Sequence, residues 1–151
     1  MRAALLALPL AAGLAAPAAA QLRPFSCIGA ERLEADAVTI GFTRGSDRVG
    51  NTALEVLGPF AAAAREAPGR NICIIAFAAA DEGGAETQSA LAARRARVLA
   101  IEIAKLGVER DRIRAEARTR GFVQGRGPLG VERSPAARVV LMPADPQTPP
   151  G

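Results

Sequence analysis

Hydrophobic residues along this chain follow two different spacings, one typical of strands and one typical of helices. Residues 37–42 (AVTIGF) alternate at every second position and include β-branched side chains, so they predict a strand. Residues 72–77 (ICIIAF) are apolar on both faces, as expected for a strand in the middle of a sheet. Residues 137–142 (ARVVLM) predict a final strand.

Between the first two strands, apolar residues recur at intervals of three and four, which is the spacing of one helix face. The pattern predicts a helix over residues 52–66, with Asn51 or Thr52 as its N-cap and with Gly58 and Pro59 weakening its middle. The residues expected to face the core are Leu54, Leu57, Phe60, Ala61 and Ala64.

A second helix is predicted from Leu91 to Leu106, after a loop at residues 78–87. Its apolar stripe consists of Ala92, Ala96, Leu99, Ile103 and Leu106. Gly107 is placed to end this helix in a left-handed conformation. Two adjacent arginines, Arg94 and Arg95, lie in its first predicted turns.

Residues 111–120 (DRIRAEARTR) predict one more strand, with charged side chains on one face and small ones on the other. The charged set is Arg112, Arg114, Glu116, Arg118 and Arg120. This face is interpreted either as a solvated sheet surface or as a basic surface for an anionic polymer. The element order β-α-β-α-β-β predicts an α/β fold (an α+β sandwich), with two main helices on one face of a mixed sheet.

The two ends of the chain differ from this central region. Residues 1–20 combine a positive start, an apolar stretch and a small-residue cleavage site, which is typical of a secretory signal peptide rather than of a transmembrane helix. Residues 21–36 predict a lead-in with little regular structure, and residues 143–151 a disordered tail. A Gly/Pro-rich loop is predicted at residues 121–135. The mature chain is therefore expected in the periplasm, without a transmembrane span.

The amino-acid composition excludes several classes of function. The chain has 151 residues, a formal net charge of +4 and no His, Trp or Tyr. Without His, the common metal sites and the Ser-His-Asp and Cys-His arrangements cannot form, so neither a metal nor a cofactor is expected. An exported chain without Trp or Tyr to stack on bases is a poor candidate for nucleic-acid binding. A binding or structural module is favoured over an enzyme.

The only two cysteines are Cys27 and Cys73. In an oxidising compartment they predict a disulfide, which would contribute roughly 3–4 kcal/mol in the chain-entropy model. The alternative is one buried thiol in a strand and one free thiol in the lead-in.

The second helix and its flanks carry a recognisable motif. The pattern L-S-x-x-R-A-x-x-V-x-x-x-L-x-x-x-G-[IV]-x-x-x-R-[IV] is matched by Leu91, Arg95, Ala96, Leu99, Ile103, Gly107, Val108, Arg112 and Ile113. Over residues 37–142 the chain resembles the OmpA-like domain, the peptidoglycan-binding domain at the C-terminus of OmpA, as a divergent member. The resemblance implies a non-catalytic periplasmic domain, associated with the cell wall or outer membrane.

The resemblance also implies a site. In the family, the helix arginine, here Arg95, and a loop aspartate hold the charged groups of diaminopimelate in the peptidoglycan stem peptide. The usual spacing falls on Ala80, so Asp81, one residue later, is the candidate aspartate. Two alternatives remain: Arg95 forms an ion pair with Asp81, Glu82 or Glu86, or the chain is a scaffold with a degenerate wall site that contacts an envelope protein.

Overall fold

A computed structural model describes residues 23–82, 85–118 and 136–144 of the chain. The expected signal peptide, the loop at 121–135 and most of the expected tail lie outside these residues. The regular elements are β1 (Ala37–Gly41), α1 (Asn51–Glu66), β2 (Ile72–Phe77), α2 (Ala85–Lys105), β3 (Ile113–Arg118) and β4 (Ala136–Leu141), with short 3-10 turns η1 (Ala30–Arg32), η2 (Ala80–Glu82) and η3 (Arg110–Arg112). Their order confirms the predicted β-α-β-α-β-β arrangement.

The four strands form one mixed sheet in the order β1-β4-β2-β3. β2 pairs with β3 in parallel and with β4 antiparallel, while β4 also pairs antiparallel with β1. β2 therefore lies inside the sheet, and its first five residues are fully buried, which explains why this strand is apolar on both faces.

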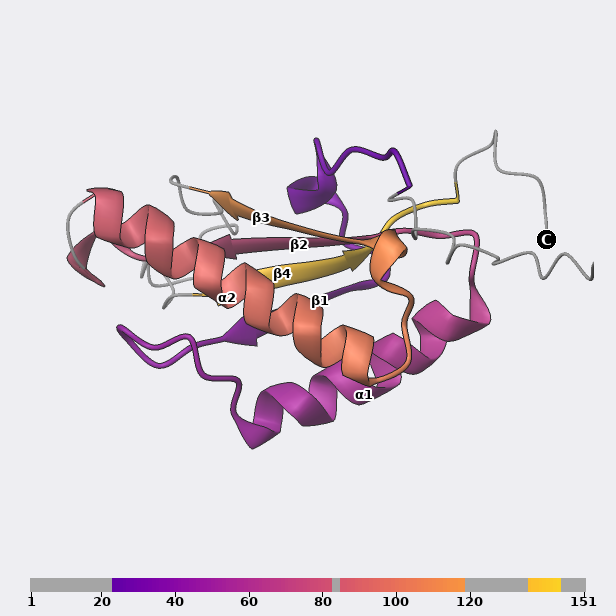
Figure 1. The fold of residues 1–151 in the computed structure, drawn as a ribbon, viewed down its shortest axis with the longest axis horizontal. Helices are drawn as coiled ribbons and strands as arrows, with labels where there is room; N and C mark the ends of the chain where they lie inside the picture. Colours follow the sequence, from indigo (N-terminus) through magenta and orange to yellow (C-terminus); the bar gives the residue numbers. More distant parts are fainter. Residues whose placement is uncertain (1–22, 83–84, 119–135, 145–151) are drawn as a thin grey trace, which may run out of the picture.

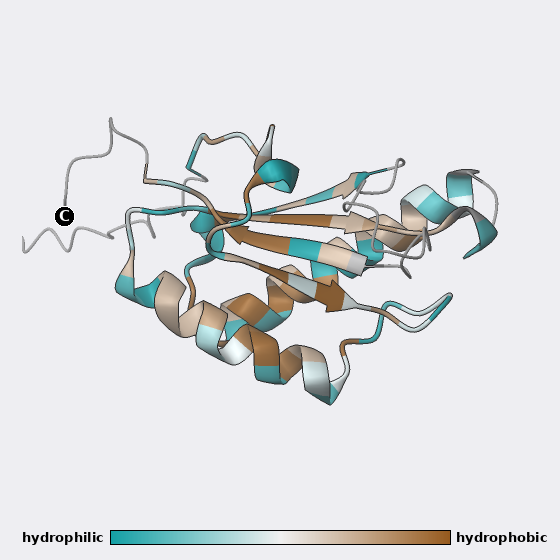
Figure 2. Cartoon of the chain, turned by 180° about the vertical axis from the view of Figure 1, so that it is seen from behind, coloured by the Kyte–Doolittle hydropathy of each residue, from teal (hydrophilic) through white to brown (hydrophobic). Residues whose placement is uncertain are grey.

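Both helices cover the same face of the sheet (Figure 1), as predicted. α1 packs mainly on β1, and α2 on β2 and β3. The core between the layers contains Leu57, Leu99, Ile103, Ile74 and Val139, all fully buried. In the part of the chain that the structure describes, hydrophobic residues run along the strands and along parts of both helices (Figure 2). Among the described helices, none has the length and apolar character needed to cross a bilayer.

The start of α1 differs from the prediction. The helix begins at Asn51, and its N-cap is Gly50, which is in an extended conformation and makes no side-chain cap. Asn51 and Thr52 are therefore helical residues rather than caps. Pro59 lies inside the continuous helix, and Leu54, expected in the core, is 40% exposed because Ala53 occupies the inward position.

α2 is longer than predicted and ends as predicted. It begins at Ala85, so the last part of the expected loop at 78–87 is helical, and Arg95 lies about three turns into the helix rather than at its start. At the other end, Gly107 has φ +93°. Its N–H donates to the carbonyl of Ala104, and the N–H of Val108 donates to that of Ile103, which together form a Schellman motif.

The lead-in crosses the sheet face opposite the helices (Figure 1). Cys27 and Ala30 from this segment pack with Cys73, Ile75 and Val140 of the sheet in a second, smaller core. Apart from η1, the described part of the lead-in contains no helix or strand, in agreement with the prediction. Its apolar side chains nevertheless give it a defined place on the sheet.

Arg112 corrects the prediction of an alternating charged strand over 111–120. The strand begins only at Ile113, and Arg112 belongs to the preceding turn η3, where it is fully buried. Its guanidinium donates to the carbonyl oxygens of Ala64 and Ala67 at 2.7 and 2.8 Å, at the C-terminal end of α1. A cation at this end of a helix satisfies carbonyls that lack helical partners.

Candidate ligand-binding site

Arg95 is the centre of a buried polar cluster at one end of the sheet. Its side chain is completely buried, and all five of its N–H groups donate hydrogen bonds. Three reach the backbone oxygens of Ser46 (2.8 Å), Phe77 (3.1 Å) and Thr43 (3.3 Å). The guanidinium therefore joins α2 to the β1–α1 loop and to the end of β2.

The remaining two N–H groups of Arg95 hold the carboxylate of Glu82 as a two-pronged pair. Nη2 lies 2.6 Å from Oε1 and Nη1 lies 3.0 Å from Oε2. The backbone N–H of Gly45 donates to Oε1 and that of Ala79 to Oε2, both at 2.7 Å. Each carboxylate oxygen thus accepts two hydrogen bonds, and the Glu82 side chain, like that of Arg95, is fully buried.

The surroundings set the ionisation of Glu82. Burial of the carboxylate raises its pKa, but the hydrogen bonds from Arg95, Gly45 and Ala79 and the charge of Arg95 together lower the pKa from 4.5 to about 2. Glu82 is therefore ionised throughout the physiological range, so the cluster contains a permanent ion pair.

Two further contacts complete the cluster. The guanidinium carbon of Arg95 lies 5.1 Å from the ring centre of Phe42, within the range of a cation–π contact. The side-chain amide of Gln88 donates to the carbonyl of Ala79 at 2.8 Å, which fixes the backbone whose N–H binds Glu82. The cluster therefore binds an anion with groups from several segments at once.

Asp81 lies next to this cluster but outside it. Its carboxylate pairs with Arg44 at 2.8 Å, and the Arg44 guanidinium also donates to the backbone oxygen of Asp81 at 2.8 Å. Both side chains are exposed, at 60% for Asp81 and 65% for Arg44. The structure thus brings Asp81 and Arg95 to the same end of the sheet, but in separate ion pairs and not in one open cleft.

The adjacent arginines of α2 have different surroundings. Arg94 points to the partly exposed carboxylate of Asp47 at 3.2 Å, whereas Arg95 points inward. Of the three partners considered for Arg95, the structure contains the ion pair with Glu82. The contacts of Arg95 with Thr43 and Ser46, and the contact of Glu82 with Gly45, were not predicted. A signal was available, since Gly45 lies in a polar stretch directly after a predicted strand, where backbone groups are free to bind side chains.

The pKa of Glu82 gives a testable pH dependence. Because its pKa is lower in the folded chain than in the unfolded one, the unfolded chain binds more protons between pH 4.5 and about 2. The stabilising contribution of Glu82 is thus complete above pH 4.5 and should be lost as the pH falls towards about 2. Urea unfolding at a series of pH values should show this loss. Glu82→Gln, which cannot titrate, should have a flatter profile, and equal slopes would contradict the expectation.

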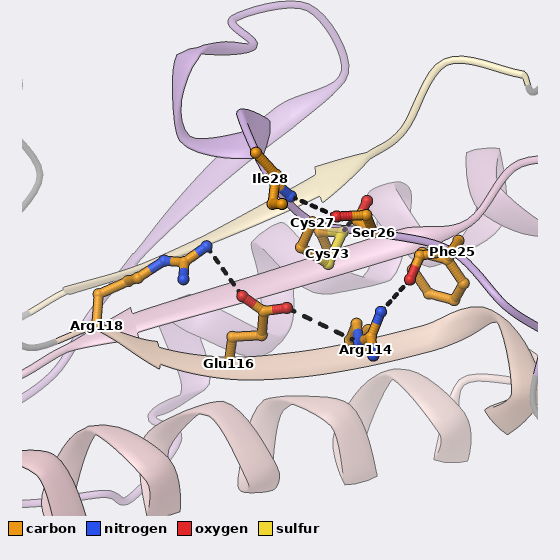
Figure 3. Close-up of a disulfide and its surroundings, with 8 residues drawn as sticks. All are labelled: Phe25, Ser26, Cys27, Ile28, Cys73, Arg114, Glu116 and Arg118. Atoms are coloured by element: carbon orange, nitrogen blue, oxygen red, sulfur yellow. Dashed lines mark hydrogen bonds and ion pairs between the residues drawn. A yellow bond between two sulfur atoms is a disulfide. The ribbon is translucent and has the colours of Figure 1, made fainter.

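On the opposite face of the sheet, Cys27 and Cys73 form the predicted disulfide (Figure 3), with Cα atoms 5.6 Å apart. Beside it, Glu116 lies between Arg114 and Arg118 and pairs with Arg118 at 2.9 Å. Arg114 also donates to the backbone oxygen of Phe25 in the lead-in (Figure 3). Much of the described charge on β3 is therefore paired within the molecule.

Comparisons with known proteins identify the fold. No protein-family model matches the sequence, and no curated protein matches it significantly. Among solved structures, the peptidoglycan-associated lipoprotein of Burkholderia pseudomallei superposes with a TM-score of 0.60 at 21% identity, over 69% of this chain and 89% of that one. The OmpA-like domain of FopA1 from Francisella tularensis has a TM-score of 0.56 at 15% identity, over 75% of this chain and 79% of that one.

The periplasmic domain of Helicobacter pylori MotB is also similar, with a TM-score of 0.53 at 14% identity, over 68% of this chain and 73% of that one. Together with the strand order and the two helices on one face, these similarities show that the chain has the OmpA-like fold. The resemblance inferred from the second-helix motif is confirmed at this level.

Proposed function

We propose that this chain is a non-catalytic domain of the cell envelope that binds peptidoglycan non-covalently. The observation that carries the proposal is a carboxylate site built around Arg95 on an OmpA-like fold. A guanidinium offers two parallel N–H groups to a carboxylate, and here two backbone N–H groups complete the arrangement. One of the structurally similar proteins, from Burkholderia pseudomallei, is named a peptidoglycan-associated lipoprotein.

The matching ligand is the diaminopimelate of the stem peptide, which carries both a carboxylate and an ammonium group. We assign the carboxylate of diaminopimelate to Arg95 and its ammonium group to Asp81. The exposed carboxylate of Asp81 would release Arg44 and bind this ammonium group instead. Residues 1–20 would direct export to the periplasm and be removed, leaving the lead-in at 21–36, the domain at 37–142 and the tail at 143–151.

Sedimentation with purified peptidoglycan tests this function. The wild-type chain should be retained, and Asp81→Asn should weaken retention about tenfold, the effect of losing one charge-assisted contact of about 1.4 kcal/mol. Asp47→Asn is the matched control, because Asp47 also pairs with an exposed arginine in the same region. Absence of retention for a folded wild-type chain, or equal retention of both variants, would argue against the assignment.

The second candidate is an OmpA-like scaffold that binds a partner protein of the envelope instead of the wall. The observation in its favour is that every N–H group of Arg95 has an intramolecular partner. In that case the Arg95–Glu82 pair would serve only to hold the loops together. If neither the folded wild-type chain nor Glu82→Ala sediments with peptidoglycan, this candidate is favoured.

A further inference from the structure

The carboxylate of Glu82 is bound in the way that a protein binds a free carboxylate ligand. The donors come from three separate places: Gly45 in the β1–α1 loop, Ala79 after β2, and Arg95 in α2. Gly45 and Arg95 are 37 and 13 residues away from Glu82 in the sequence, so neither contact is a local turn interaction. The tertiary fold thus brings two of the three donor residues to Glu82, and only Ala79, three residues earlier in the chain, is a local contact.

Glu82 reaches this site from the surface. It belongs to the short turn η2, in which Asp81 is exposed and Glu82 as a whole residue is partly exposed. Only its side chain is fully buried. Removing the two terminal carbons of this side chain would therefore leave a small cationic cavity just below a solvent-exposed turn.

We propose that Glu82 is an internal ligand: it occupies a carboxylate-binding site and keeps it closed to an external carboxylate. The identity of that external group, a carboxylate of the wall peptide, rests on the proposed function. In the wild-type chain the external group must compete with a carboxylate that is covalently attached and already holds four N–H groups. Wall binding by the wild type should accordingly be weak, and loss of Glu82 should strengthen it.

The first experiment replaces the missing carboxylate by a soluble one. In Glu82→Ala the side chain lacks a CH₂–CO₂⁻ unit, which corresponds to acetate. The melting temperature of Glu82→Ala should be well below that of the wild type and should rise by several degrees with increasing sodium acetate, compared with sodium chloride at equal ionic strength. The wild type and the double variant Glu82→Ala/Arg95→Leu should not respond to acetate specifically.

If Glu82→Ala does not fold in chloride, refolding of the same variant in acetate is the readout. Glu82→Gln provides a second variant of unchanged size, in which the neutral amide holds Arg95 less strongly and acetate should again raise the melting temperature. Absence of an acetate-specific effect in both variants would overturn the proposal, because the site would then not accept an external carboxylate.

The second experiment compares sedimentation with purified peptidoglycan below the melting temperature of each protein. Glu82→Ala should be retained about tenfold more tightly than the wild type, and acetate should compete with this gain. If acetate stabilises the variant but its retention equals that of a retained wild type, Glu82 does not control wall binding and the proposal is overturned. If acetate stabilises the variant and neither protein is retained, the carboxylate site is upheld and the proposed function fails.

Discussion

Replacement of Arg95 by leucine is expected to destabilise the domain by about 3–5 kcal/mol, the cost of leaving a buried charge without its partner. The variant would keep the carboxylate of Glu82 buried with only the backbone N–H groups of Gly45 and Ala79 as donors. It would also leave the carbonyl oxygens to which Arg95 donates without that donor. Urea unfolding followed by circular dichroism measures the effect.

The neighbouring arginine is the matched control. Arg94→Leu removes an exposed ion pair with Asp47, in which the Arg94 side chain is 54% exposed, so the loss should stay within about 1 kcal/mol. The double variant Arg95→Leu/Glu82→Leu should be more stable than Arg95→Leu alone, since it removes the unpaired charge as well. Equal unfolding midpoints for the Arg94 and Arg95 variants would contradict the buried ion pair.

Hydrophobic spacing predicted the helix layer and the sheet of this fold, but not the packing of the lead-in on the other face of the sheet. β2 is apolar on both faces, and such a strand can only be covered from both sides, as it is here by α2 and by the lead-in. The apolar stripe from Ala92 to Ile103 predicted which face of α2 packs on the sheet. Gly107 predicted where the helix ends, because its positive φ is a conformation that glycine adopts without strain.

The first turns of α2 were missed for a physical reason. Residues 85–90 (AETQSA) carry no large apolar side chain, so the spacing rule has nothing to detect. Helix propensity of the alanines and of Glu86, which lies in the first turn where the helix dipole favours an acid, supports the helix there instead. The spacing of apolar residues therefore could not predict where α2 begins.

The candidate site was predicted in part. The motif in the second helix singled out Arg95, and the surrounding sequence offered three acidic partners for it. Which one enters the site depends on the direction of each side chain in the turn η2: Glu82 points inward to Arg95, while the adjacent Asp81 points outward to Arg44. A single position along the turn thus separates a buried carboxylate from an exposed one, and residue spacing alone does not determine that direction.

The disulfide should be the second large contribution to stability. Cys27 and Cys73 close a loop with a sequence separation of 46, for which the chain-entropy model gives about 4 kcal/mol. Reduction, or the double replacement Cys27→Ala/Cys73→Ala, should lower the unfolding free energy by that order. Urea unfolding with and without dithiothreitol measures the difference.

The loss of stability on removing the disulfide should also be confined at first to the lead-in. Without the disulfide, the lead-in still has its apolar side chains and two ion pairs, of Arg23 with Asp111 and of Asp36 with Arg70. Arg114 and Arg138 also donate to its backbone oxygens at Phe25 and Leu33. An exposed ion pair contributes about 1 kcal/mol or less, so amide hydrogen exchange should accelerate first around Cys27 and later in β2, which is inside the sheet. The Cys→Ala double variant must not respond to dithiothreitol. If reduction leaves both the urea midpoint and the exchange of the lead-in unchanged, the covalent link contributes nothing to holding this segment on the sheet.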